Sequence, residues 1–202
     1  VKYLEYDEDK SMALIEWLEI LKIFGAQKVV IYVIKVHVQM MKVLRLYEND
    51  GLVEVIELNH PQVLPTPKEN TLQFLMRQLI SYHDCFYRHN NNYKYIIPLD
   101  IDEFIIPKFK EDRTWNDLLK RVVAKNPRKV FSSAAFVAQN AFFFIDELKK
   151  FHFIENVNRA KHFSEPHRHA KSFMRTDQVL TIHNHLPLSC VMENKCSNIE
   201  ID

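Results

Sequence analysis

Helix-like and strand-like segments alternate along this chain, and this alternation limits the folds it can adopt more than any other feature. Residues 11–24 carry apolar side chains at helical spacing, with Ser11 as the expected N-cap and Gly25 just past the expected end. Residues 29–34 form a continuous β-branched run with one tyrosine, which is typical of a parallel strand buried on both faces. The pattern therefore predicts an α/β fold.

The same alternation continues toward the C-terminus. We predict further helices over 38–49, 70–88 and 114–124, the last starting at Thr114, and strands over 52–58, 95–99 and 129–137. Alternating elements of these lengths indicate an α/β/α sandwich around a mainly parallel, mixed sheet. The chain has 202 residues, so we expect residues 1–202 to form one domain.

The composition excludes several kinds of nucleotide and nucleic-acid binding. The chain contains only two glycines, Gly25 and Gly51, so it has neither a GxGxxG turn nor a GxxxxGK[ST] loop. Any bound nucleotide must have its phosphates neutralised by something other than a glycine-rich backbone cradle. The formal net charge is +1, which gives no overall field for nucleic acid or an anionic membrane.

Two carboxylates follow the predicted strand over 95–99. Asp100 and Asp102 would point the same way if the chain stayed extended, at the strand end where open α/β sheets bind ligands. Two close like charges repel unless a cation lies between them, and hard oxygen ligands suit Mn²⁺ or Mg²⁺. Apolar residues flank the acidic group on both sides, which favours a metal site over a solvated turn.

At these residues the sequence resembles glycosyltransferase family 92. The resemblance rests first on residues 84–88, which begin Asp84-Cys85, and on residues 95–103, which end in Asp-Ile-Asp-Glu. Other matching segments follow in the same order along nearly the whole chain: 15–19, 24–32, 47–55, 142–144, 171–173 and 182–185.

The resemblance implies a GT-A-like, Rossmann-type fold and a metal-dependent, inverting transfer of a sugar, typically galactose, from a UDP-sugar to a glycan acceptor. Asp100 and Asp102 would hold Mn²⁺ or Mg²⁺, and His183 or His185 would complete the metal shell, unless the pair is a surface feature of an edge strand. The residues expected to bind the donor are Arg77, Asp84, Glu103 and Lys171. Family members are usually type II membrane proteins of the Golgi, so full-length localisation in the Golgi lumen is expected.

An inverting transfer also needs a carboxylate that deprotonates the acceptor hydroxyl. The later half of the chain offers Asp146, Glu147, Glu155, Glu165 and Asp177, and no spacing selects one of them. Trp17, Trp115 and the three phenylalanines of 142–144 are expected in the core, although an exposed ring among 142–144 would be free to stack on an acceptor sugar.

Two other functions remain open from the sequence. One is a metal-dependent phosphatase with Asp100 as nucleophile and Asp102 as acid/base. The Glu-Phe-Ile that follows Asp102 and the lack of any glycine after Gly51 argue against this hypothesis. The other is a non-catalytic transferase fold that only binds glycans or partners. It is kept open because a His-Tyr-Arg segment, typical of the family downstream of 182–185, does not occur.

The ends of the chain and its cysteines give further expectations. No apolar stretch is long enough for a transmembrane helix, and the chain does not begin with Met. We therefore expect a fragment truncated at both ends, attached to a membrane only through a segment outside this chain. Cys190 and Cys196 could close a short loop in a secretory protein, leaving Cys85 free or bonded elsewhere.

Overall fold

The computed structural model describes residues 3–58, 71–146, 149, 151–165, 168–192 and 196–201. The N-terminal half contains β1 (Leu4–Tyr6), α1 (Ser11–Phe24), β2 (Val29–Val36), α2 (Val38–Asn49), β3 (Val53–Glu57) and α3 (Thr71–His89). The C-terminal half contains β4 (Tyr95–Ile96), α4 (Trp115–Lys125), α5 (Pro127–Val130), β5 (Ser133–Ala138), β6 (Lys171–Arg175), β7 (Val179–Ile182), β8 (Pro187–Cys190) and β9 (Ser197–Ile201). The α/β class is confirmed.

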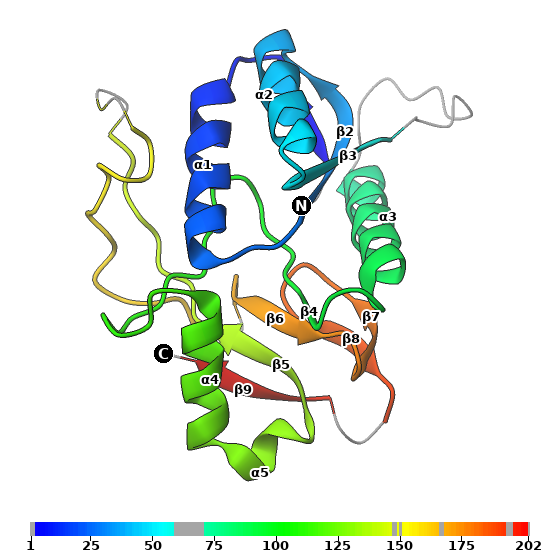
Figure 1. Cartoon of the computed structure of the whole chain (residues 1–202), viewed down its shortest axis with the longest axis vertical. Coiled ribbons are helices and arrows are strands. Elements are labelled where there is room, and N and C mark those ends of the chain that lie inside the picture. Colours follow the sequence, from blue (N-terminus) through cyan, green and yellow to red (C-terminus); the bar gives the residue numbers. More distant parts are fainter. Residues whose placement is uncertain are drawn as a thin grey trace.

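The first half forms a parallel sheet in the order β1-β2-β3, with helices on both faces (Figure 1). Successive side chains of β2 point to opposite faces, and both faces are covered. Ile31 packs in the cluster that contains the buried side chains of α1 and α2, whereas Tyr32 packs with Cys85 of α3. This double burial explains why β2 is an uninterrupted apolar run.

Caps define several helix ends. Gly25 and Gly51 have φ values of 93° and 82°, which a residue without Cβ adopts readily, and they follow α1 and α2 as predicted. Thr114 caps α4 in a reciprocal pair with Asp117. The prediction for Ser11 is wrong, because the N-cap of α1 is Lys10, and the Ser11 amide donates to the Asp9 carboxylate at 2.9 Å.

The second half differs from the single, mainly parallel sheet that was expected. Its strands form a mixed sheet in the order β4-β6-β5-β9 and a separate β7-β8 hairpin. The predicted strand over 95–99 is reduced to two residues, which pair antiparallel with β6. Pro98 accounts for the early end, because proline has no N–H to donate to a ladder and restricts the residue before it.

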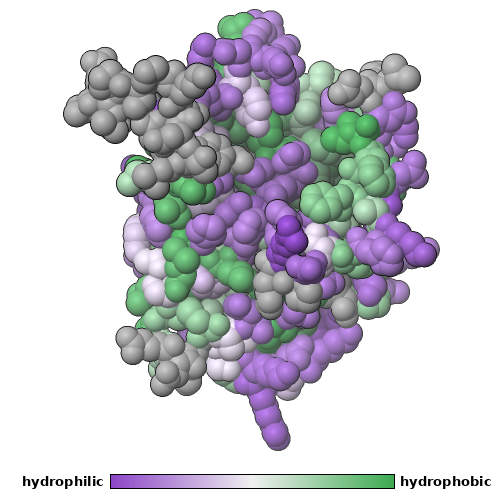
Figure 2. All heavy atoms as spheres, turned by 180° about the vertical axis from the view of Figure 1, so that it is seen from behind, coloured by the Kyte–Doolittle hydropathy of each residue, from purple (hydrophilic) through white to green (hydrophobic). Residues whose placement is uncertain are grey.

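The described residues of 139–146 and 151–165 run along one side of the molecule with little regular structure (Figure 1). Trp17 and Trp115 are buried, as predicted, but the prediction of a buried 142–144 is wrong. Phe142, Phe143 and Phe144 have exposed fractions of 55%, 44% and 63%. In the view from behind, hydrophobic surface gathers on the side where this segment runs (Figure 2).

Cys190 and Cys196 form a disulfide, as the short-loop reading of the sequence anticipated, and Cys85 is a free, half-buried thiol. Burial raises the pKa of the Cys85 thiol, so it stays protonated near neutral pH. Of the helices that the structure describes, none combines the length and the apolar character needed to cross a membrane.

Candidate active site

The acidic segment that follows β4 forms a tight turn. The Glu103 amide donates to the Asp100 carbonyl at 3.1 Å, and the Glu103 carboxylate accepts a hydrogen bond from the Asp100 amide at 2.8 Å. Ile101 is buried within this turn, whereas Asp102 is exposed and Asp100 is half-buried. The turn rests on α1, because the indole N–H of Trp17 donates to the Glu103 carbonyl at 3.0 Å.

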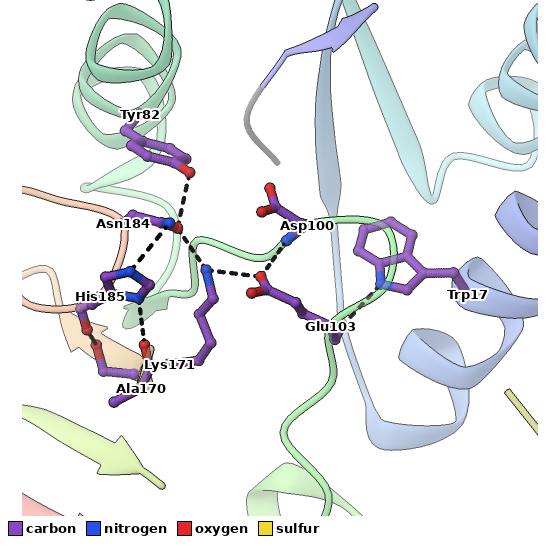
Figure 3. Close-up of polar contacts among 9 residues, drawn as sticks. Trp17, Tyr82, Asp100, Glu103, Ala170, Lys171, Asn184 and His185 are labelled. Carbon is purple, nitrogen blue, oxygen red and sulfur yellow. Dashed lines mark hydrogen bonds and ion pairs between the residues drawn. The ribbon is translucent and has the colours of Figure 1, made fainter. Parts of the chain in front are cut away.

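A buried lysine meets this turn (Figure 3). Lys171, the first residue of β6, has an exposed fraction of 6%, and its Nζ lies 2.8 Å from the Glu103 carboxylate. The same ammonium donates to the side-chain carbonyl of Asn184 at 2.6 Å, and this oxygen also accepts from the Tyr82 hydroxyl at 3.0 Å. Four separate segments therefore meet here: α3, the acidic turn, β6 and the connection between β7 and β8.

The burial of this cluster shifts two pKa values. Burial raises the pKa of the Glu103 carboxyl, Lys171 opposes this shift, and the neighbouring charge of Asp100 adds to it. Burial and the charge of Asp100 also raise the pKa of Tyr82 well above its usual range. Tyr82 therefore remains a hydrogen-bond donor at any physiological pH, and together with the Lys171 ammonium it orients the Asn184 amide so that its oxygen faces the two donors.

His185 lies next to the cluster in a defined protonation state. Burial lowers its pKa, and the positive charge of Lys171 contributes. Its Nδ1 lies 2.7 Å from the Ala170 carbonyl, which can only accept, so Nδ1 carries the proton. Its Nε2 is 3.5 Å from the Asn184 amide nitrogen. The ring centres of His183 and His185 are 6.2 Å apart.

Two predicted donor-binding residues have partners outside this cluster. Arg77 lies 3.6 Å from Glu5 of β1. The Asp84 carboxylate accepts hydrogen bonds of 2.6 Å from both the Tyr32 hydroxyl and Arg88. Burial raises the pKa of Asp84, but these two donors more than offset it, so the pKa lies below its usual range.

The carboxylates considered as the catalytic base are spread over the later half. Asp177 pairs with Arg175 at 2.7 Å, Glu165 lies 3.6 Å from Arg168, and the Glu155 carboxylate accepts from the Phe151 amide. Asp146 is exposed, and its amide donates to Asn156. Glu147 lies outside the described residues.

The donor chemistry of the acidic turn fits a hard divalent cation. Within the described part of the chain, no group of three His, Cys, Asp or Glu residues is arranged to hold a metal ion by itself. Mg²⁺-like ions often use only one or two protein carboxylates and complete their shell with water and substrate phosphates. Asp100 and Asp102 match that mode of binding, rather than a closed all-protein cage.

Sequence reasoning missed two members of the cluster, Tyr82 and Asn184. Tyr82 lies within the predicted long helix, where a buried aromatic residue looks like ordinary core packing. Asn184 lies between the two histidines that were singled out, but a lone amide has no characteristic spacing. In each case the signal is a long-range contact, since Tyr82 and Asn184 are 102 residues apart in the chain.

A cavity at the start of β2 is a separate feature. It has a volume of about 340 Å³ and lies where β2 begins, with Val29, Val30, Tyr95 and Trp115 among its lining residues. Ligands in open α/β sheets bind outside the carboxyl ends of the strands, whereas this cavity lies at the opposite end of β2. The candidate site is therefore the acidic turn and its buried lysine.

Comparison with known proteins bears directly on this site. A sequence model described as glycosyltransferase family 92 matches residues 1–202, the whole chain. Searches of curated proteins and of solved structures found no match. The family match covers the acidic turn, Lys171 and Asn184 together, and it agrees with the resemblance seen in the sequence. The chain belongs to glycosyltransferase family 92.

Proposed function

We propose that this chain transfers a sugar, galactose, from a UDP-sugar to a glycan acceptor with inversion of configuration at the anomeric carbon. We also propose that the transfer requires Mn²⁺ or Mg²⁺. The observation that carries the proposal is the junction of the Asp-Ile-Asp-Glu turn with the buried Lys171. Family membership supports a sugar donor and a glycan acceptor. The choice of galactose rests on the resemblance of the sequence to the family.

In this proposal the carboxylates of Asp100 and Asp102 hold the cation. The cation would neutralise charge on the departing diphosphate, the task that a glycine-rich cradle performs in other nucleotide-binding proteins. Asp102 is exposed and reaches solvent, where a donor would arrive, while Asp100 is held by the turn.

Lys171 is the proposed second source of positive charge. An ammonium has three N–H donors, and Glu103 and Asn184 occupy two of them. Within the described part of the chain these two are its side-chain partners, and in the proposal the third N–H turns to a diphosphate oxygen. Because Glu103 and Asn184 hold the ammonium in place, little side-chain freedom would be lost when a phosphate binds.

We extend the proposal to a site of action in the Golgi lumen. The disulfide between Cys190 and Cys196 supports it, because disulfides form and persist in the oxidising compartments of the secretory route. The family's usual location in the Golgi supports it as well.

Calorimetric titration with UDP tests the role of Asp100 and Asp102. We expect binding in the presence of Mn²⁺, a loss of at least about tenfold in affinity for Asp102→Asn, and the same loss with EDTA, since removing either partner breaks the same contact. Asp50→Asn is the matched control, because Asp50 is an exposed carboxylate that pairs with Lys22. Equal affinities with Mn²⁺ and with EDTA would overturn the metal-dependent proposal.

The donor sugar is tested by turnover. UDP release from UDP-galactose, without release from UDP-N-acetylglucosamine, is the expected result for a galactosyltransferase. UDP binding without turnover of any UDP-sugar would instead support the non-catalytic alternative.

A further inference from the structure

A short aromatic ribbon lies beside the candidate active site. Residues 142–144 run antiparallel to residues 158–160: the Ala160 amide donates to the Phe142 carbonyl at 2.7 Å, and the Phe144 amide donates to the Asn158 carbonyl at 2.9 Å. These hydrogen bonds hold the backbone of a segment whose three phenylalanines are largely exposed to solvent. Packing in the hydrophobic core does not explain why these exposed rings are held on a constrained backbone.

A row of rings connects this ribbon to the Lys171 cluster. The ring of Phe142 meets His169 edge-on, with centroids 6.0 Å apart, and His169 meets His185 edge-on at 6.2 Å. His185 in turn lies 3.5 Å from Asn184, which binds Lys171. Phe142 is thus joined to the ammonium by a continuous series of contacts.

The backbone at His169 is strained. Its φ is 56°, and it is the one residue other than glycine with a positive φ among the residues that the structure describes. Such a conformation is unfavourable for a residue with a Cβ and persists where the surroundings hold it. Here the strain brings an exposed imidazole between Phe142 and His185.

The far part of the same segment is fastened to the body of the protein. Glu16 of α1 is buried and accepts hydrogen bonds from the amides of His152, Phe153 and Ile154, at 2.9, 2.9 and 2.7 Å. The ring of Phe153 packs edge-on against Phe104, which directly follows the acidic turn, with centroids 4.9 Å apart. The ribbon is therefore supported from α1 and from the active-site turn.

We propose that Phe142 and His169 form the acceptor subsite, in which the apolar face of a neutral saccharide ring stacks on Phe142 and one of its hydroxyls bonds the His169 imidazole. A sugar ring has an apolar C–H face and a rim of hydroxyls, and the subsite offers an aromatic face beside a nitrogen donor or acceptor. The role as acceptor subsite rests on the proposed function, whereas saccharide binding there can be measured without it.

Saturation-transfer NMR tests the subsite with two defined probes, lactose and N,N′-diacetylchitobiose. We expect at least one probe to bind the wild-type protein, Phe142→Ala to weaken that binding at least fivefold, and Phe142→Tyr to retain it. Phe131→Ala is the matched control, because Phe131 is 83% exposed and lies beyond α5, outside the row of rings. Thermal unfolding checks that each variant folds.

The outcomes separate this inference from the proposed function. The proposed subsite is overturned if neither probe binds the wild-type protein. It is also overturned if the Phe142→Ala and Phe131→Ala variants bind the probes equally well. In turnover assays, Phe142→Ala and His169→Ala should raise the acceptor KM while the calorimetric affinity for UDP stays unchanged. Saccharide binding that depends on Phe142, in a protein that fails to bind UDP, would uphold the glycan site and overturn the transferase proposal.

Discussion

At the scale of single residues, Glu16 illustrates how one carboxylate holds an irregular segment. One of its oxygens accepts from two amides, those of Phe153 and Ile154, and the other accepts from His152. In Glu16→Gln the amide nitrogen must face one of these donors. We expect the free energy of unfolding to fall by about 1–3 kcal/mol, the cost of a lost charged hydrogen bond and an unsatisfied buried donor.

Urea unfolding measures the loss, and hydrogen exchange locates it at residues 152–154. Glu8→Gln serves as the control, because Glu8 is exposed. Unchanged exchange at 152–154 in Glu16→Gln would show that these three hydrogen bonds do not hold the segment.

The candidate site was only partly predictable from such residues. Asp100, Glu103 and Lys171 were predicted, through the acidic motif and the family resemblance, and they come together in space. Tyr82 and Asn184 were not, because a phenol and an amide gain their roles from the long-range contacts around Lys171. A linear pattern identifies groups that are unusual in themselves, and it misses ordinary groups that become important through burial.

At the scale of elements, α4 offers a direct test of a local sequence signal. The Thr114 hydroxyl accepts a hydrogen bond from the Asp117 amide, and the Asp117 carboxylate accepts one from the Thr114 amide. Thr114→Ala removes the first interaction, and with it the 2.8 Å hydrogen bond that the hydroxyl donates to the Asp117 carboxylate, so the free energy of unfolding should fall by about 1 kcal/mol. Urea denaturation provides the measurement.

Lys120→Ala, on the exposed surface of the same helix, is the control, and it should change stability by less than about 0.5 kcal/mol. A Thr114→Ala variant no less stable than Lys120→Ala would mean that packing of α4, rather than its cap, determines where this helix begins.

Helices and strands differ in how well local patterns predict them. The helices over 38–49 and 114–124 lie within about a residue of α2 and α4, because periodicity and caps are local. Strand pairing is not local. A mainly parallel, mixed sheet was expected, yet β4 pairs antiparallel with β6, which lies far along the chain. No pattern within 95–99 specifies that partner.

At the scale of the whole molecule, the described strands form separate sheets that must be held together by other means. The disulfide is one such link, because Cys190 ends β8 of the hairpin and Cys196 directly precedes β9 of the mixed sheet. It closes a loop with a sequence separation of 6. A covalent link between two sheets limits how far they can separate in partly unfolded states.

Reduction of this disulfide should destabilise the whole domain. For so short a loop, the chain-entropy model gives a loss of about 2 kcal/mol in the free energy of unfolding, and the double variant Cys190→Ser/Cys196→Ser should show the same loss. Urea denaturation with and without dithiothreitol measures it. Dithiothreitol should leave the double variant unchanged, which excludes an effect through the free thiol of Cys85. A wild-type protein as stable with dithiothreitol as without it would show that packing alone joins β8 to β9, because its stability would then owe nothing to the covalent link.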